Sequence, residues 1–291
     1  MNPKKVIGIG ELLWDVLPAG KRIGGAPVNF THYVNQSGCE GYAVSAIGSD
    51  ASGDELLAKF VSLGLNAGYV QRNAFPTGSV GVTLDDKGVP TYDIYENVAW
   101  DNIATDEATL ALASRADAVC WGSLAQRSGV SRRTILAIVD AVRSDALKVF
   151  DINLRQNYYD EPTLAASLER ATVLKLNDDE LKVLAPLYSL SGDDEAQLRQ
   201  LLERFSLQYV VYTMGAVGSL ILGADGSRSY VATPKVAVAD TVGAGDSFTA
   251  TFVSMLLQGH PLAEAHRRAV DVAAYVCTCN GAIAPLAAMK A

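Results

Sequence analysis

The stretch from Val149 to Leu176, VFDINLRQNYYDEPTLAASLERATVLKL, decides the fold that we expect. Its two apolar runs, Val149–Ile152 and Val173–Leu176, are typical of buried strands and enclose a helical pattern at Thr163–Arg170. A strand, a helix and a second strand in this order predict a βαβ unit with parallel strands and a right-handed crossover. Further strands are expected at Val6–Ile9, Ala43–Ile47, Ala118–Trp121 and Tyr209–Thr213, and further helices at Val28–Gln36, Asp54–Leu63, Glu107–Ser114, Arg132–Val142 and Glu195–Phe205. A hairpin at Ser219–Leu222 and Ser229–Ala232, and two long helices at Ala244–Gln258 and Leu262–Asn280, are expected at the end. This alternation predicts an α/β fold, a Rossmann-like, mostly parallel sheet flanked by helices, with residues 1–291 in a single domain.

Two regions interrupt the alternation and predict a small second β-sheet. Leu12–Val16 breaks the rhythm after the first strand, and Ser79–Ala99 alternates on both sides of a turn at Asp85-Asp86-Lys87-Gly88. We expect strands from about 12–17 and 78–100 to be inserted as a lid over a cleft, as a homodimer contact, or as both. An extra edge of the main sheet is the alternative.

The composition favours an ordinary globular protein. Hydrophobic residues make up 49% of the 291 residues and charged residues 19%, which allows a sizeable core. The net charge of −8 disfavours binding to phosphate backbones, so we expect no nucleic-acid partner. No apolar stretch approaches the ~20 residues of a membrane span and no secretory leader is recognisable, so we expect no membrane partner and a cytoplasmic location. The four cysteines lack a metal-binding spacing and are expected to be buried free thiols.

The segment DTVGAGDSFTATFVSMLL, from Asp240 to Leu257, predicts an anion site at the start of a helix. Its small residues, Gly243, Ala244 and Gly245, let a ligand approach the backbone, and the first amides of a helix have no intrahelical partner. Asp246 in the first turn has two interpretations: it favours the helix N-terminus electrostatically, or it is a general base beside a bound phosphoryl group. The phosphate-loop sequence G-x-x-x-x-G-K-[ST] does not occur in the chain, so phosphoryl transfer requires another cradle.

Two motifs together resemble the signatures of the PfkB (ribokinase-like) carbohydrate kinase family. The residues DTVGAGDSF from Asp240 to Phe248 resemble its C-terminal signature, and GGAPVNFT from Gly24 to Thr31 resembles its N-terminal signature. The order and separation of the two motifs match the family, and the resemblance covers essentially the whole chain. The opening GIGELLWDVLP, which contains Asp15, is most similar to the fructokinase branch. The resemblance implies a ribokinase-like domain that transfers the γ-phosphoryl group of MgATP to a primary hydroxyl of a small sugar, with fructose as the first candidate.

The resemblance also implies roles for the residues at the sugar end of the site. Asp246 would be the catalytic base, and backbone amides of the segment from Gly243 to Asp246 would stabilise the transferring group. Sugar binding would involve Asp15, Gly24, Gly25, Asn29, Arg155 and Asp246. Arg155 lies in a D-x-N-x-R segment and could reach nucleotide phosphates or the sugar. A surface ion pair for Arg155, a loop carboxylate for Asp15 and an ordinary loop ending at the glycines are the alternatives.

The nucleotide and cation residues follow from the same resemblance. Asn177 and Glu180 form an N-x-x-E motif that would hold Mg²⁺ largely through water; an acid-rich helix N-terminus is the alternative. Thr213, Gly215 and Gly218 form a T-x-G-x-x-G segment beside the nucleotide, or a plain strand-turn-strand. Asn280 would lie near adenine. A monovalent cation such as K⁺ would bind backbone carbonyls near Asp240 and Val242.

Several alternatives stay open at the level of sequence. The region from Asn73 to Ala113 contains no arginine and carries Glu96, whereas fructokinases often have a lid arginine, so fructose is in doubt while kinase chemistry is not. Other PfkB-type kinases, acting on ribose, 2-keto-3-deoxygluconate or a nucleoside, and a catalytically silent sugar-binding protein are the main rivals. An oxidoreductase is disfavoured because Gly8-Ile9-Gly10 is followed by Leu13 where G-x-G-x-x-G requires glycine.

Overall fold

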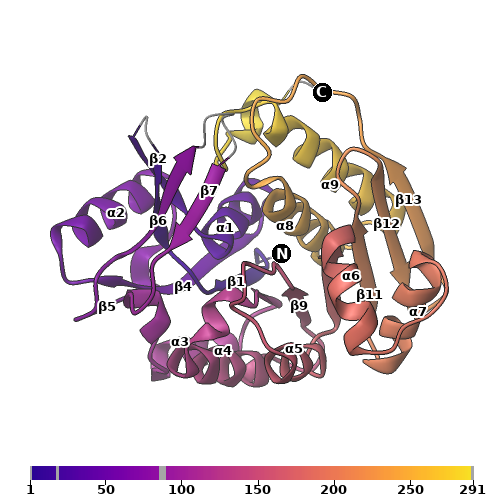
Figure 1. Ribbon diagram of the computed structural model, residues 1–291, viewed down its shortest axis with the longest axis horizontal. Helices are drawn as coiled ribbons and strands as arrows, with labels where there is room; N and C mark the ends of the chain where they lie inside the picture. The colour runs from indigo at the N-terminus through magenta and orange to yellow at the C-terminus, as the bar shows by residue number, and fades with distance from the viewer. Residues whose placement is uncertain (1, 18–19, 85–89, 290–291) are drawn as a thin grey trace.

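The computed structural model describes residues 2–17, 20–84 and 90–289 and contains a large, mostly parallel sheet (Figure 1). Within these residues the sheet has nine strands in the order β13-β12-β11-β10-β9-β8-β1-β4-β5. The pairs β11–β12 and β12–β13 are antiparallel, and the other pairs of this sheet are parallel. The bounds are β1 Lys5–Ile9, β4 Glu40–Gly48, β5 Val70–Asn73, β8 Ala118–Trp121, β9 Leu147–Asp151, β10 Val173–Asn177, β11 Tyr209–Thr213, β12 Gly218–Gly223 and β13 Arg228–Ala232. The expected α/β architecture is confirmed.

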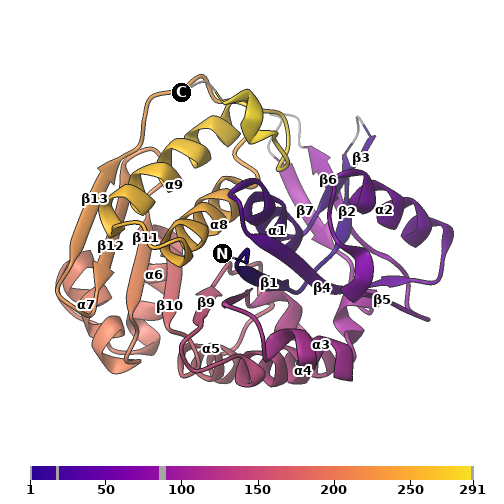
Figure 2. The same cartoon turned by 180° about the vertical axis from the view of Figure 1, so that it is seen from behind.

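Helices cover both faces of this sheet because successive residues of each strand point to opposite sides. Val6 and Val149 pack under α1, α8 and α9, and their neighbours Ile7 and Phe150 pack on the other face, under α3 to α7 (Figures 1 and 2). The helix bounds are α1 Ala26–Gln36, α2 Ala51–Ser62, α3 Glu107–Ala113, α4 Gly129–Ala141, α5 Glu161–Leu168, α6 Asp178–Leu187, α7 Asp194–Arg204, α8 Ala244–Leu257 and α9 Leu262–Cys277. The main strands are therefore nearly continuous apolar runs, as in other parallel sheets that are buried on both faces.

The second sheet is separate from the main one, so the interpretation as an extra edge of the main sheet is wrong. Its order is β3-β2-β6-β7, formed by β2 Leu13–Leu17, β3 Gly20–Gly24, β6 Gly78–Leu84 and β7 Pro90–Ile94. It stands beside α1 and α2, at the end of the molecule away from β12 and β13 (Figures 1 and 2). The turn expected at Asp85-Asp86-Lys87-Gly88 falls at positions outside the described residues. A homodimer through this sheet stays a prediction.

Strands β3 and β5 were not predicted because their sequences carry little periodic signal, and helix α6 was anticipated only as an acid-rich helix N-terminus at Asn177 and Glu180. Strand β3, GKRIG, exposes its first three residues, and β5, VQRN, is a polar edge strand. Helix α6 begins at an N-cap residue, Asn177, and contains Pro186. Gly8-Ile9-Gly10 leads through Leu12 into β2 and not into a helix, which excludes the dinucleotide-binding geometry. The four cysteines are free thiols, of which Cys39 and Cys120 are buried.

No helix in the described ranges combines the length and the apolar character needed to cross a bilayer.

Candidate active site

A large cavity lies at the carboxyl ends of the main strands, between the small sheet and the N-termini of α1 and α8. Its volume is about 1430 Å³. This exceeds the roughly 300–1,000 Å³ of an ordinary small-ligand pocket, so two ligands fit side by side. From the expected site residues the structure brings to its wall Asp15, Gly25, Asn29, Arg155, Asn177, Thr213, Gly215, Gly218, Val242, Gly243, Ala244, Gly245 and Asp246. Gly24, Glu180, Asp240 and Asn280 do not line it.

The N-terminus of α8 depends on the left-handed conformation of Gly243. This residue is the N-cap, with φ of 80°. A Cβ at Gly243 would lie 2.7 Å from the carbonyl oxygen of Ala282 and 2.8 Å from its Cα, so a side chain is excluded both by the backbone angle and by space. The tight packing against Ala282 fixes the place where α8 begins, so that Ala244, Gly245 and Asp246 line the cavity. The positive end of the helix dipole therefore faces any anion bound there.

Asp246 and Asn29 meet across the cavity floor, although they lie 217 positions apart. The Nδ2 of Asn29 donates to the Oδ2 of Asp246 at 2.8 Å, which joins α1 to α8. Burial raises the pKa of the Asp246 carboxyl to about 6, an effect that the Asn29 hydrogen bond opposes and that nearby Asp151 reinforces. A carboxylate with such a pKa is ionised at neutral pH and accepts a proton more readily than an ordinary aspartate.

The glycine pair before α1, Gly24 and Gly25, leaves space for the side chain of Asp15 and for the backbone of Glu11. A Cβ at Gly24 would collide with the carboxylate of Asp15, and a Cβ at Gly25 would collide with the backbone carbonyl of Glu11. Gly25 also has φ of 110°, which other residues rarely adopt. Asp15 on β2 is half-buried, and burial raises the pKa of its carboxyl to about 6 against the opposing charge of Arg22. Gly24 thus acts on the site indirectly, through the space that it leaves to Asp15.

Asn177 and Glu180 form a reciprocal cap on α6. The amide of Glu180 donates to Oδ1 of Asn177 at 2.9 Å, and the amide of Asn177 donates to Oε2 of Glu180 at 2.8 Å. The other carboxylate oxygen of Glu180 accepts from the amide of Leu154 at 3.0 Å, so Glu180 also fixes the loop after β9. Asn177, Asp178 and Asp179 reach the cavity wall, whereas Glu180 is buried behind it. The contacts favour the helix-cap interpretation for Glu180.

Two buried charged residues at the cavity were missed by the sequence analysis. Lys175 Nζ lies 3.0 Å from Oδ1 of Asp151, and a Cβ on Gly245 would sit 3.2 Å from the same Nζ. Burial opposes the charge of Lys175, but Asp151 and Glu180 outweigh it and raise the pKa of the ammonium group to about 12. Glu11 is 4% exposed, and burial raises the pKa of its carboxyl to about 7. The sequence did contain a signal for Lys175, because a lysine inside the apolar strand VLKL is unusual.

The segment near the expected cation site is organised by Asp240. Its carboxylate accepts from the amides of Val242 at 3.1 Å and Gly281 at 3.0 Å, and it lies 3.7 Å from a guanidinium nitrogen of Arg22. These bonds hold the loop before α8 against the end of α9. Asn280 is exposed at that end. Glu96 is not on the cavity wall either; its carboxylate accepts from the hydroxyl of Tyr158 at 2.8 Å.

A parallel sheet whose carboxyl edge presents a helix N-terminus and an adjacent buried carboxylate is the arrangement of an α/β phosphotransferase for small molecules. The chain belongs to the pfkB family of carbohydrate kinases, because the sequence model of that family matches residues 11–289. It is therefore a sugar kinase, and the expected family and enzyme class are confirmed.

Individual relatives support the fructokinase-like branch. Fructokinase of Salmonella typhimurium is 29% identical over 87% of this chain and 84% of its own length. An ATP-dependent 6-phosphofructokinase of Thermoanaerobacterium thermosaccharolyticum is 25% identical, covering 97% and 90%. The solved structure of a fructokinase with bound ATP from Xylella fastidiosa, 24% identical, superimposes with a TM-score of 0.83 over 96% of this chain and 93% of that one. The last likeness confirms the fold.

Proposed function

We propose that this kinase transfers the γ-phosphoryl group of MgATP to a primary hydroxyl of fructose. The observation that carries the proposal is the contact between Asn29 and Asp246 at the N-terminus of α8, inside a cavity large enough for both substrates. A sugar hydroxyl placed at this contact would meet the base and the anion cradle together. The fructokinase among the relatives supports fructose as the acceptor, and the ATP-dependent 6-phosphofructokinase supports ATP as the donor.

The cavity has two ends that suit the two ligands. Asp15, Gly25 and Asn29 lie at the end near the small sheet, where carboxylate and amide groups would bind sugar hydroxyls. The other end of the cavity is lined by Thr213, Gly215 and Gly218, at β11 and β12, which are the fourth and fifth strands from β1 in the main sheet. The glycines there would allow close approach of a nucleotide. We further propose that the small sheet is a lid that covers the sugar and excludes water from the transferring group.

The residues around α8 divide the chemistry between them. Asp246 takes the proton from the attacking hydroxyl, and the amides of Ala244, Gly245 and Asp246 stabilise the negative charge that moves onto the phosphoryl oxygens. Lys175, held by Asp151 behind Gly245, adds a fixed positive charge close to the same position. Arg155 at the cavity rim would contact a phosphate or the sugar.

The donor groups on the wall fit Mg²⁺ held jointly with phosphates. The described ranges contain no cluster of three acidic, histidine or cysteine ligands, and Mg²⁺ typically needs only one or two protein oxygens beside water and phosphate. Asn177 offers an oxygen on the wall, and Glu180 keeps lone pairs that reach the ion through water. When bound, Mg²⁺ neutralises phosphate charge. Backbone carbonyls near Asp240 and Val242 are the proposed site for K⁺.

The choice of fructose is tested by a substrate panel. Glu11, Asp15 and Asp246 make the sugar end acidic, which would repel a sugar that already carries a phosphate. We expect ADP release with fructose to exceed release with fructose 6-phosphate, ribose, tagatose, 2-keto-3-deoxygluconate and adenosine, measured by a coupled assay at equal concentrations. Faster turnover of any other acceptor would reassign the substrate, and no turnover with any acceptor would favour a silent sugar-binding protein.

The pKa of Asp246 predicts the acid side of the pH profile. Because the base must be ionised, kcat/KM for the sugar should level off above about pH 6 and fall by about tenfold per unit below it. Steady-state rates between about pH 5 and 8 measure this. Glu11→Gln is the control, and its acid limb should persist. A limb that disappears in Glu11→Gln would assign the titration to Glu11 instead.

A further inference from the structure

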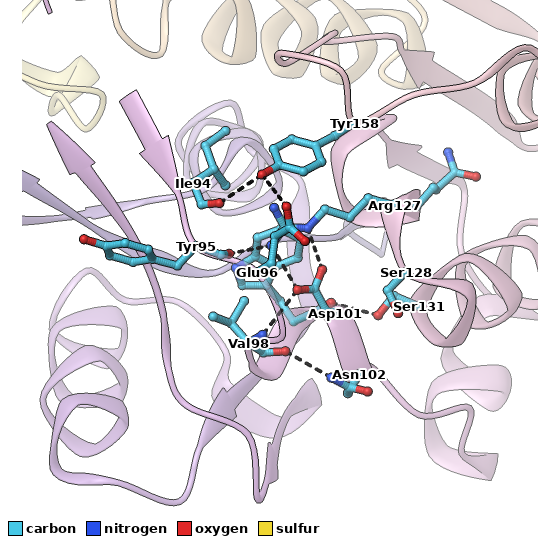
Figure 3. Close-up of polar contacts among 12 residues, drawn as sticks. Ile94, Tyr95, Glu96, Val98, Asp101, Asn102, Arg127, Ser128, Ser131 and Tyr158 are labelled. Carbon is cyan, nitrogen blue, oxygen red and sulfur yellow. Dashed lines mark hydrogen bonds and ion pairs between the residues drawn. The ribbon is translucent and has the colours of Figure 1, made fainter. Parts of the chain in front are cut away.

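Arg127 is a buried arginine that joins three segments at the base of the small sheet (Figure 3). It ends the short 3₁₀ helix η3, Leu124–Arg127, which follows β8. Its Nε donates to Oδ1 of Asp101 at 2.8 Å and its Nη2 to Oδ2 of the same carboxylate at 2.9 Å. Both side chains are nearly inaccessible, at 7% and 6% exposure. This is the two-pronged geometry in which arginine differs most from lysine.

The same guanidinium contacts the segment through which the chain leaves the small sheet. We call residues 94–102 the lid root; the segment runs from the end of β7 through the 3₁₀ helix η2, Ala99–Asn102. Nη2 of Arg127 donates to the backbone carbonyl of Tyr95 at 2.6 Å, and Asp101 also accepts from the amide of Val98 at 3.2 Å. The lid root is thus tied to the main sheet by backbone as well as side-chain bonds.

A third contact links the lid root to the loop that carries Arg155. The guanidinium carbon of Arg127 lies 4.1 Å from the ring centre of Trp100 and 4.7 Å from that of Tyr158, so it is stacked between two aromatic rings. The Tyr158 hydroxyl donates to the carboxylate of Glu96 at 2.8 Å, and its oxygen lies 3.3 Å from the carbonyl oxygen of Ile94, a second acceptor for the same proton. Tyr158 lies three residues after Arg155 in the loop following β9, so both the lid root and this loop rest on Arg127.

The energetics of the buried pair of Arg127 and Asp101 favour a role in positioning the segments over a role in stabilising the fold. Nη1 of Arg127 is buried with no hydrogen-bond partner among the described residues. Buried ion pairs contribute little net stability compared with apolar packing, and an unsatisfied buried nitrogen adds a further cost. What such a pair provides is a fixed geometry.

We propose that Arg127 is a positioning residue that sets the affinity for the sugar without touching it. This rests on the proposed function of the small sheet as a lid. Ile94 in the lid root, Leu124 on η3 and Arg155 all line the cavity, and Ile94 pairs through Val80 with Asp15 at the sugar end. The nucleotide end, at Thr213 and Gly215, belongs to strands on the other side of β9 and β10. Through Ile94 and Leu124, Arg127 therefore shapes the sugar end of the cavity and not the strands that carry Thr213 and Gly218.

The test is a comparison of the two Michaelis constants in Arg127→Lys. Lysine keeps the charge but loses the two-pronged pair and the stacking, so we expect KM for the sugar to rise about tenfold, as for about 1.4 kcal/mol of lost binding, with KM for ATP within about twofold of wild type. Arg204→Lys is the matched control, because Arg204 also stacks on two aromatic rings and donates to a backbone carbonyl, that of Tyr188. Its guanidinium carbon lies 4.9 Å from the ring centre of Tyr188 and 5.7 Å from that of Phe205. Arg204 lies on α7, away from the cavity. Its two KM values should not change.

The outcomes separate the alternatives. A folded Arg127→Lys with an unchanged sugar KM, or with both KM values raised equally, overturns the proposal. If Arg127→Lys does not fold, Tyr158→Phe and Tyr158→Ala replace it. Tyr158→Phe removes only the hydrogen bonding of the hydroxyl to the lid root and should raise the KM for the sugar by about threefold. Tyr158→Ala also removes the ring and should raise this KM further. Unchanged sugar KM in both overturns the proposal as well. The constants are measured with whichever sugar the wild type phosphorylates, so a wild type inactive on fructose counts only against the proposed substrate.

Discussion

Asp246→Asn is expected to lower kcat by about 100-fold or more while the affinity for ATP is preserved, because the amide cannot accept the hydroxyl proton. The fold should not suffer. Burial raises the pKa of this carboxyl from 3.8 to about 6, so the unfolded chain releases the proton first and ionisation costs stability as the pH rises through this range. Removing the charge at neutral pH should leave the melting temperature equal or higher. Coupled ADP release, ATP binding and thermal unfolding measure the three quantities.

Asp54→Asn is the control that separates a base from a helix-dipole partner. Asp54 also lies in the first turn of a helix, α2, but it is exposed and paired with Arg72. If Asp246 only favoured its helix N-terminus, both variants would lose a few tenths of a kcal/mol and neither would lose activity. Near-normal kcat in Asp246→Asn would remove the assignment of the base.

Gly243→Ala is expected to lower kcat by about 100-fold, the typical effect of a 1 Å misplacement of catalytic groups. The added methyl group would meet the backbone of Ala282 at 2.7–2.8 Å, so the N-terminus of α8 has to move away from its position in the cavity. The amides that face the transferring group and the carboxylate of Asp246 would move with it. Steady-state kinetics with both substrates, together with thermal unfolding, test this.

Gly259→Ala isolates the strain of the backbone angle. Gly259 follows α8 with φ of 84°, close to the 80° of Gly243, but a Cβ there meets no atom within 4 Å. Both variants pay the left-handed strain of ~1–2 kcal/mol, and only Gly243→Ala adds the collision. Equal kinetic effects in the two variants would show that strain, and not the position of the cradle, limits the activity.

The sequence placed the main strands and helices to within a few residues because buried strands and amphipathic helices have local periodicity. It failed where stability comes from partners. Gly20–Gly24 pairs as β3 through backbone bonds to β2, and only Ile23 of its larger side chains is buried. The N-x-x-E motif also did not show that both carboxylate oxygens of Glu180 accept backbone amides, while its role toward Mg²⁺ stays a prediction. The sequence shows which groups are present, and the distant amide of Leu154 decides how one of them is used.

The missing lid arginine has a similar explanation. No arginine occurs from Asn73 to Ala113, but Arg127 at the end of η3 reaches the lid root and forms a pair with Asp101 inside that range. Glu96, which stood out in the sequence, accepts from Tyr158 away from the cavity wall. The contacts at this place thus join two segments that are separate in the sequence.

By itself the sequence determined the strand-helix alternation, the glycines that allow close approach to the backbone before α1 and α8, and the family to which the chain belongs. The alternation follows from the spacing of apolar residues and the glycines from backbone sterics, which both act within a few residues, whereas the family follows from the resemblance of the two signature motifs. Only the tertiary structure decided that Asn29 meets Asp246, that Lys175 and Glu11 are buried at the cavity, and that Arg127 ties the lid root to the Arg155 loop. Such contacts depend on the order of strands in the sheet, and local periodicity carries no information about that order.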